Sequence, residues 1–296
     1  MSTSDHEEDF ADLFGGSDDE EVKQPEHTFQ KFQRQPEFVL EGTPSELELR
    51  LVGSHPLWAH YLWNAAKVFA NYLDEHKDLC GGKTVLELGA GAALPGLIAA
   101  LNGAQKTVIT DYPDRELIEN IEYNVKTNLS SLHEQNAVSV KVNIHTSFVS
   151  LHTYLIVYRL LSTQGYVWGT KVGTLQEELP SGETKYDIII LSDLIFNHSQ
   201  HHAMLRTCRE LIKPKTGVVL VFYTHHRPHL AHRDVQFFEI AERPYNPETD
   251  PENGDEVGYS FHAEEFLTQN MGVMFEEDQG DQTVRSTVHG WKLWLD

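Results

Sequence analysis

Residues 83–96 read Lys83-Thr-Val-Leu-Glu-Leu-Gly-Ala-Gly-Ala-Ala-Leu-Pro-Gly96 and predict a strand, a tight turn and the start of a helix. The strand, residues 84–88, is apolar enough to be covered on both faces, as strands of parallel sheets are. Gly89 and Gly91 allow the turn and leave backbone N–H groups bare for a ligand at the start of the helix. Such a unit is typical of α/β folds that bind nucleosides.

A second strand follows, with the sequence Val108-Ile-Thr-Asp-Tyr-Pro113. Its Asp111 lies about 20 residues beyond the turn, where a carboxylate at the end of the second strand can accept the hydroxyls of a ribose. We therefore expect the glycine turn and Asp111 to hold one nucleoside ligand between them.

The turn can serve NAD, FAD or S-adenosylmethionine, and its details favour S-adenosylmethionine. A dinucleotide site wants a third small residue at position 94, where this chain has Leu94 followed by Pro95. Glu87, two residues before the first glycine, suits a cationic ligand better than a diphosphate. A NAD enzyme, or a turn that only connects strand to helix, is the alternative.

The composition points to an intracellular protein that meets a basic protein partner. Among 296 residues, 45 Asp and Glu against 23 Lys and Arg give a formal net charge of −22. Such a surface repels phosphates, so direct binding of nucleic acid is not expected. The two cysteines, Cys80 and Cys208, indicate neither a disulfide framework nor a zinc cluster. We see no export signal and no membrane segment, and we expect a cytoplasmic monomer.

Alternating strands and helices predict an α/β fold with a mostly parallel sheet, helices on both faces and a closing antiparallel hairpin. Residues 1–30 are too acidic to bury a core and predict a disordered arm, and residues 31–296 predict one domain. Trp63 is expected to pack in the core. The expected strands are 47–52, 84–88, 107–110, 138–142, 186–191, 217–223 and a hairpin of 272–277 and 287–295; the expected helices are 95–102, 114–128, 199–212 and one launched near Pro56 that carries Leu57, Tyr61 and Tyr72 on its apolar face.

Several segments together resemble the seven-strand protein lysine methyltransferases of family sixteen. They are Arg50-Leu-Val-Gly-Ser-His-Pro-Leu-Trp58, the 87–96 turn, Thr110-Asp-Tyr-Pro113, Tyr166-Val-Trp-Gly169, Ser192-Asp-Leu-Ile-Phe-Asn-His198, His225-His-Arg-Pro228 and Val288-His-Gly-Trp291. The resemblance covers the chain from about Leu49 to its end and implies a Rossmann-like, seven-stranded methyltransferase sheet. It implies an S-adenosylmethionine-dependent enzyme that modifies the N-terminal α-amine or a nearby lysine of translation elongation factor 1-alpha.

The resemblance also implies the residues that bind the cofactor. The amides of Gly89, Ala90 and Gly91 would meet its methionine carboxylate, and Asp111 its ribose. The remaining positions are Trp58, which would close over the methionine end, Trp168, which would cover the adenine, and Ser192, which would lie beside the adenosine.

Asp193-Leu-Ile-Phe196 falls where this family keeps its substrate loop. Methyl transfer to an amine is a direct displacement, so the enzyme must align the reactants and present the amine unprotonated. Asp193 would hold the ammonium, while Phe196 and Asn197 would define the channel. The alternative is that Asp193 only caps the helix 199–212.

The histidines 225, 226, 229 and 232 crowd together, and His201 and His202 are adjacent. Arg227 and Arg233 lie among them and disfavour a divalent cation, so we expect no metal site. The resemblance favours a role for these histidines in shaping the mouth of the substrate site.

Residues 142–164 do not fit the family pattern, in which the third strand passes almost directly into Tyr-Val-Trp-Gly. Joining Lys141 to Gly165 restores that pattern, and the residues at both ends are compatible with splice signals. Our hypothesis is a retained intron translated in frame; a real inserted helix or lid is the alternative. Its interruption by His152 and Arg159 excludes a membrane span.

Two rivals to a protein methyltransferase stay open. One is a small-molecule amine methyltransferase, acting on a compound such as nicotinamide. The other is a cofactor-binding scaffold without catalytic activity.

Overall fold

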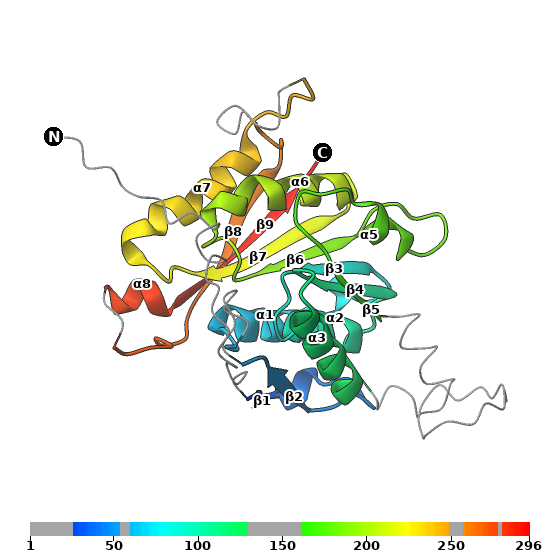
Figure 1. The fold of residues 1–296 in the computed structure, drawn as a ribbon, viewed down its shortest axis with the longest axis vertical. Helices are drawn as coiled ribbons and strands as arrows, with labels where there is room; N and C mark the ends of the chain where they lie inside the picture. Colours follow the sequence, from blue (N-terminus) through cyan, green and yellow to red (C-terminus); the bar gives the residue numbers. More distant parts are fainter. Residues whose placement is uncertain (1–25, 54–59, 130–160, 249–256, 278–279) are drawn as a thin grey trace, which may run out of the picture.

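The computed structural model describes residues 26–53, 60–129, 161–248, 257–277 and 280–296. A seven-stranded sheet runs through the centre in the order β5-β4-β3-β6-β7-β9-β8. The strands β3 to β7 are parallel, and β9 pairs antiparallel with both β7 and β8. The predicted α/β fold, with a mostly parallel sheet and an antiparallel C-terminal hairpin, is confirmed (Figure 1).

The strands of this sheet are β3 (Thr84–Leu88), β4 (Lys106–Asp111), β5 (Leu161–Gly165), β6 (Ile188–Ser192), β7 (Val218–Thr224), β8 (His262–Asn270) and β9 (Thr287–Trp294). A separate hairpin is formed by β1 (Thr28–Gln33) and β2 (Glu46–Leu51). The helices are α1 (Asn64–Glu75), α2 (Leu94–Leu101), α3 (Arg115–Asn128), α5 (Gly173–Glu177), α6 (His201–Leu211), α7 (Ala231–Glu242) and α8 (Gln282–Ser286). No helix within these described ranges has the length and apolar character needed to cross a membrane.

The direction in which strands are added reverses between β3 and β6. From β3 the chain proceeds to β4 and β5 on one side, whereas β6 and β7 extend the sheet on the other. Strands of this central pair are almost fully buried, which explains their continuous apolar sequence. In open parallel sheets, the crevice outside the carboxyl ends at such a reversal is where ligands bind.

Two hydrophobic layers cover the two faces of the sheet. The first contains the apolar sides of α1, α2 and α3, and the second those of α5, α6 and α7. Figure 1 shows these two groups of helices on opposite sides of the sheet. Their apolar faces account for the helical periodicity that the sequence displays.

A ladder of buried asparagines attaches the β1–β2 hairpin to α3. Asn120, Asn124 and Asn128 follow one another at four-residue spacing, so they lie on one face of the helix. Asn124 accepts from the Arg50 amide at 2.7 Å, and Asn128 accepts from the Glu48 amide at 2.9 Å. Their side-chain nitrogens donate back to the carbonyls of the same two residues. The helix therefore takes the place of a neighbouring strand along β2.

A buried ion pair joins the same hairpin to α1. The guanidinium of Arg34 donates to both carboxylate oxygens of Asp74, at 2.9 and 2.8 Å, and both side chains are almost fully buried. Asn102 at the end of α2 donates to Asp74 as well. Because removing one partner leaves a buried charge uncompensated, this pair holds the position of the hairpin firmly.

Three sequence predictions differ from the structure at element boundaries. The first helix begins at Asn64 rather than near Pro56, because Trp63 before it has an extended backbone; residues 54–59 lie outside the described residues. The first strand of the C-terminal hairpin is residues 262–270 rather than 272–277. This edge strand is mostly exposed and carries Glu264 and Glu265, so it lacks the apolar alternation of a half-buried strand. Strand β1 begins at Thr28, inside the predicted disordered arm.

The edge strand β5 includes the end of the questioned segment 142–164. It pairs with β4 from Thr107 opposite Leu161 to Asp111 opposite Gly165. Within the described residues, the Ser162 hydroxyl and the Gln164 side-chain nitrogen are buried without a hydrogen-bond partner. The predicted strand 138–142 lies outside the described residues. The sequence of β5 thus places polar side chains at positions where the described residues offer them no hydrogen-bond partner.

We propose that residues 142–164 are dispensable for the fold. Joining Lys141 to Gly165 would bring Val138-Ser-Val-Lys141 into the four positions now held by Leu161-Ser-Thr-Gln164. Val138 and Val140 suit a strand, and a lysine at the fourth position can extend its ammonium to water.

A chain deleted for residues 142–164 is expected to fold and to melt at a temperature no lower than the full chain, because a better strand replaces β5. Scanning calorimetry of both proteins checks this result. A deleted chain that is insoluble or melts lower contradicts dispensability. Sequencing the spliced message tests the origin of the segment, and a mature message that keeps these codons contradicts the retained-intron hypothesis.

Candidate active site

The glycine turn after β3 adopts the conformation that its sequence predicts. Gly89 and Gly91 have φ values of 60° and 52°, in the left-handed region that favours glycine. A Cβ atom on Gly89 would lie 2.7 Å from a methyl carbon of Leu194 and 2.9 Å from the ring of Trp168. The turn therefore packs closely against both side chains, and the structure places Trp168, which the resemblance implies as the residue covering the adenine, next to Gly89.

Asp111, at the end of β4, forms a hydrogen bond with the glycine turn. Its carboxylate accepts from the Gly91 amide at 2.7 Å and from the Tyr112 amide at 2.7 Å. The Ala90 amide donates to the Thr110 carbonyl at 3.0 Å. The expectation that the turn leaves its amides bare is thus wrong for Ala90 and Gly91, because the turn folds back over the end of β4. The Asp111 carboxylate is therefore held at the turn by backbone amides from the loops after both β3 and β4.

Glu87 does not face the ligand crevice as the sequence interpretation supposed. It is fully buried under the turn, and one of its oxygens accepts from the Gly96 amide in the first turn of α2 at 3.0 Å. Its other oxygen has no partner in the described part of the chain. Burial raises the pKa of this carboxyl well above its ordinary value, against the lowering effect of the Gly96 hydrogen bond. Glu87 therefore joins helix to strand from a buried position that disfavours its charged form.

Asp193 follows β6 with φ 60°, a value that is strained for a residue other than glycine. Its amide donates to the Phe222 carbonyl at 2.7 Å. Its Oδ1 atom accepts from the Thr224 amide at 3.2 Å and contacts Nε2 of His226 at 2.9 Å. The alternative that Asp193 caps the following helix is wrong, because α6 begins after Gln200 without a side-chain cap.

Buried polar atoms without partners gather at the carboxyl ends of β6 and β7. Within the described residues, they include Oγ of Ser192, Oδ2 of Asp193 and Oγ1 of Thr224. Buried polar groups are nearly always hydrogen-bonded, since each unsatisfied one costs about 1–3 kcal/mol. Ser192 and Asp193 are both predicted site residues. A bound ligand could form the hydrogen bonds that these three buried oxygen atoms lack.

His226, the ring in contact with the Asp193 carboxylate, packs on two other aromatic side chains. The imidazole of His226 packs edge-to-face with the indole of Trp63, at 4.7 Å between centroids, and with Phe196, at 6.0 Å. Trp63 is only half-buried at the N-terminus of α1, so its predicted place in the core is wrong. Aromatic rings that face a carboxylate suit a ligand with a cationic head.

Two other predicted site residues contribute less to this arrangement. Asn197 forms a local turn, in which its side-chain oxygen accepts from the Ser199 hydroxyl at 3.0 Å. Trp58 lies outside the described residues. The structure therefore brings Asp193 and Phe196 together at one place, and Gly89, Gly91, Asp111 and Trp168 at another.

The neighbouring histidines are tied to one carboxylate of α7. Asp234 contacts Nε2 of His198 and Nδ1 of His225, each at 2.7 Å. Burial acts to raise the pKa of Asp234, but the hydrogen bonds from both histidines outweigh it and hold the pKa below its ordinary value. His201 is buried and contacts the Ile195 carbonyl at 2.7 Å; burial lowers its pKa to about 4. These histidines fix the loop that carries Asp193 and Phe196.

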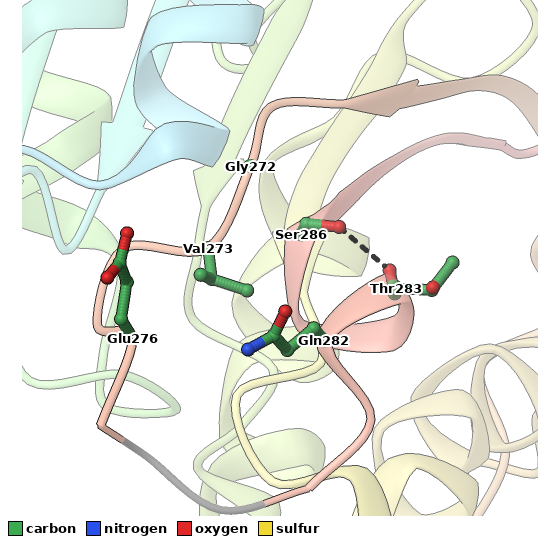
Figure 2. Close-up of a pocket in the computed structure, with 6 residues that line it drawn as sticks. All are labelled: Gly272, Val273, Glu276, Gln282, Thr283 and Ser286. Carbon is green, nitrogen blue, oxygen red and sulfur yellow. Dashed lines mark hydrogen bonds between the residues drawn. The ribbon is translucent and has the colours of Figure 1, made fainter.

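A hollow of about 450 Å³ lies beside this loop, between the segment after β8 and helix α8. Figure 2 shows its walls, which consist of Gly272, Val273, Glu276, Gln282, Thr283 and Ser286. The adjacent Phe275 packs on Tyr61 at 4.9 Å and on Trp63 at 6.2 Å between ring centroids. Trp63 thus packs both on His226 and on Phe275, the neighbour in sequence of Glu276, which lines the hollow.

The sequence analysis placed Trp63 in the core and assigned no role to Thr224 or Phe275. His226 and Thr224 follow the carboxyl end of β7, as Asp193 follows that of β6. Because both ends lie at the same edge of a parallel sheet, that position was the available signal. Trp63 and Phe275 come from segments whose boundaries the sequence predicted wrongly, so their meeting could not be foreseen.

Comparison with known proteins agrees with this geometry. Residues 45–153 match the lysine methyltransferase family. The chain is 38% identical over 259 residues to a protein N-terminal and lysine N-methyltransferase of Schizosaccharomyces pombe, spanning 87% of this chain and 86% of that protein. It is 37% identical over 296 residues to its namesake from Eremothecium gossypii, spanning 98% of each. The chain belongs to the lysine methyltransferase family, as its sequence motifs predict.

Solved structures of methyltransferases also align with this fold. The 16S rRNA methyltransferase of T. thermophilus, in complex with AdoMet and guanosine, aligns with a TM-score of 0.45 at 12% identity. That alignment covers 91% of this chain and 51% of the other.

The substitution Glu87→Gln is expected to change how stability depends on pH. Unfolded chains ionise a glutamate near pH 4.5, whereas the buried Glu87 has a raised pKa, so the wild type loses stability as pH rises above 4.5. The variant lacks this titration. Its free energy of unfolding relative to wild type should rise by up to about 1.4 kcal/mol per pH unit until the folded pKa is passed. Denaturant unfolding across this range checks the slope, and a difference independent of pH contradicts it.

Proposed function

We propose that this chain transfers a methyl group from S-adenosylmethionine to an amine of a protein, either an N-terminal α-amine or a lysine nearby. One observation carries the proposal: the Asp193 carboxylate has a buried oxygen without a described partner, among aromatic rings, on the loop that touches the glycine turn. An ammonium is the ligand class that completes such a carboxylate.

The residues at the turn fit the proposed cofactor. Asp111 carries a carboxylate at the end of β4, the residue type that accepts ribose hydroxyls, and the half-buried ring of Trp168 lies against Gly89, where an adenine can stack. The unpartnered Ser192 hydroxyl lies at the end of the adjacent strand. When bound, the cofactor supplies a methyl group on a sulfonium, which an amine displaces directly. A nicotinamide dinucleotide is not favoured, because Leu94 and Pro95 stand where it needs a small residue.

The substrate side fits an extended chain end rather than a small molecule. Trp63 and Phe196 both pack on His226, the ring in contact with Asp193. Phe275 packs on Trp63 and directly precedes Glu276, which lines the hollow of Figure 2. A small amine would be enclosed by Trp63, Phe196 and His226 and would not extend to Phe275. The hollow therefore favours a protein substrate over a compound such as nicotinamide.

Translation elongation factor 1-alpha is the proposed target. The relatives that this chain matches are named for methylation of protein N-termini and lysines, and the sequence resemblance adds the target. The net charge of −22 favours encounter with a basic surface and disfavours direct contact with nucleic acid. We place the reaction in the cytoplasm, where this factor acts.

Calorimetry and a methylation assay test the proposal together. S-adenosylmethionine is titrated into the chain, and labelled cofactor is then supplied with elongation factor 1-alpha or with nicotinamide. The variant Asp193→Asn should lose about 100-fold or more in kcat, because it removes the carboxylate that holds the amine, while the Kd for the cofactor stays unchanged. Asp111→Asn should instead weaken cofactor binding.

The matched control is Asp78→Asn, the same substitution at an exposed residue of the 3-10 helix Lys77–Leu79, which precedes β3. It should leave both measurements unchanged. Absence of binding heat for S-adenosylmethionine rules out the proposal, and full activity of Asp193→Asn rules out its substrate site. Labelled nicotinamide in place of labelled protein would identify a small-molecule enzyme, and cofactor binding without any transfer would identify a scaffold.

A further inference from the structure

We propose that His226 is the base that removes the proton from the incoming amine, with Asp193 orienting its ring. The inference rests on the proposed methyl transfer and assigns a residue for a step which that reaction requires. An amine attacks only through its lone pair, and both α-amines and lysines enter mostly protonated at neutral pH.

The contact with Asp193 sets which nitrogen of His226 can accept a proton. Nε2 lies 2.9 Å from Oδ1 of Asp193, and a carboxylate can only accept, so Nε2 carries the hydrogen. In the neutral ring, Nδ1 then has the free lone pair. No described residue forms a hydrogen bond with Nδ1 in this structure.

The surroundings keep the ring in one orientation. Trp63 packs on one edge at 4.7 Å, and Phe196 approaches at 6.0 Å. Arg227, the next residue, donates to the Phe196 carbonyl at 3.1 Å and so ties the two loops together. The imidazole is therefore already oriented before the substrate binds, and a correctly positioned base is the condition for efficient proton transfer.

Exposure separates the tasks of the two side chains. The Asp193 side chain is 3% exposed, whereas that of His226 is 26% exposed. His226 is therefore the member of the pair from which a proton can leave directly to water. An imidazole is also a stronger base than a carboxylate, by about 2.5 pKa units in small peptides.

Charged groups from three segments act on His226. Burial and the neighbouring Arg227 lower the pKa of His226, whereas Asp193 on the β6 loop and Asp234 on α7 raise it. The raising effects are larger, so the pKa of His226 is raised from the ordinary histidine value of 6.5. Asp234 is itself bound by His198 and His225. The ring is consequently a stronger base than a free histidine.

The proposed step balances without any further reactant. The ammonium of the substrate gives its proton to Nδ1, and His226 becomes an imidazolium stabilised by Asp193. The amine lone pair then forms the N–C bond while the C–S bond breaks and its electron pair stays on sulfur. The proton on His226 leaves to solvent through the exposed edge of the ring.

The pH dependence of His226→Gln tests this assignment. A glutamine amide can still donate to Asp193, but it cannot accept a proton in this pH range. In the wild type, kcat/KM should rise through the pKa of His226 and then level off, because the enzyme deprotonates the substrate. In the variant, kcat/KM should fall by about 100-fold or more. It should also keep rising with pH until the pH reaches the pKa of the free amine. The cofactor Kd, measured by calorimetry, should not change.

The control is His262→Gln, the same substitution on the exposed edge strand β8, where His262 contacts Asp296. It should reproduce the wild-type profile. A His226→Gln variant that levels off as the wild type does overturns the proposal.

A second measurement needs no variant and holds if His226→Gln fails to fold. The imidazole signals of His226 in the wild-type chain are titrated by NMR and compared with the pKa of the kinetic profile. Agreement of the two values above 6.5 supports the proposal, and disagreement overturns it. The two hypotheses remain separable: a wild-type chain that methylates nothing refutes the proposed function, whereas an active chain with discordant pKa values refutes only the role of His226.

Discussion

The parallel pairing of β3 with β6 is the constraint on which the rest of the site depends. These two strands are buried on both faces, and their register places Leu88 opposite Leu191. The loops that leave their carboxyl ends therefore meet, so that Leu194 contacts the turn at Gly89. In the proposed function, Gly89 and Asp193 serve the cofactor and the substrate, and the pairing of β3 with β6 sets the distance between their two loops. Direct displacement requires this alignment of donor and acceptor more than any covalent chemistry.

The site retains features that a protein built only for stability would avoid. Asp193 has a left-handed backbone, which costs on the order of 1 kcal/mol for a residue with a side chain. Its second carboxylate oxygen, together with the hydroxyls of Ser192 and Thr224, is buried without a described partner. Strain and unsatisfied groups at one edge of a well-packed sheet are expected where ligand binding supplies the missing interactions.

Structure far from the chemistry holds the walls of the site in place. The asparagine ladder of α3 and the Arg34–Asp74 pair attach the β1–β2 hairpin to α3 and α1. Helix α1 begins directly after Trp63, the ring that packs on His226. On the other side, Asp234 of α7 binds two histidines and so fixes the loop of Phe196. The aromatic approach to Asp193 is thus supported by buried polar contacts on both faces of the sheet.

The sequence by itself determined the parallel core and the glycine turn and pointed to Asp111, because strand burial and turn geometry depend on short, local patterns. The Asp193–Phe196 loop was expected only from the resemblance to the family. The sequence did not determine the partners of those residues. Asp111 accepts from Gly91, Glu87 accepts from Gly96, and Asp193 contacts His226, and each of these contacts joins two different elements or loops of the chain. The polar edge strand β8 and the extended Trp63 also escaped prediction, since neither carries an apolar repeat. Only the packing of the whole sheet decides such contacts, because it alone fixes which loops share an edge.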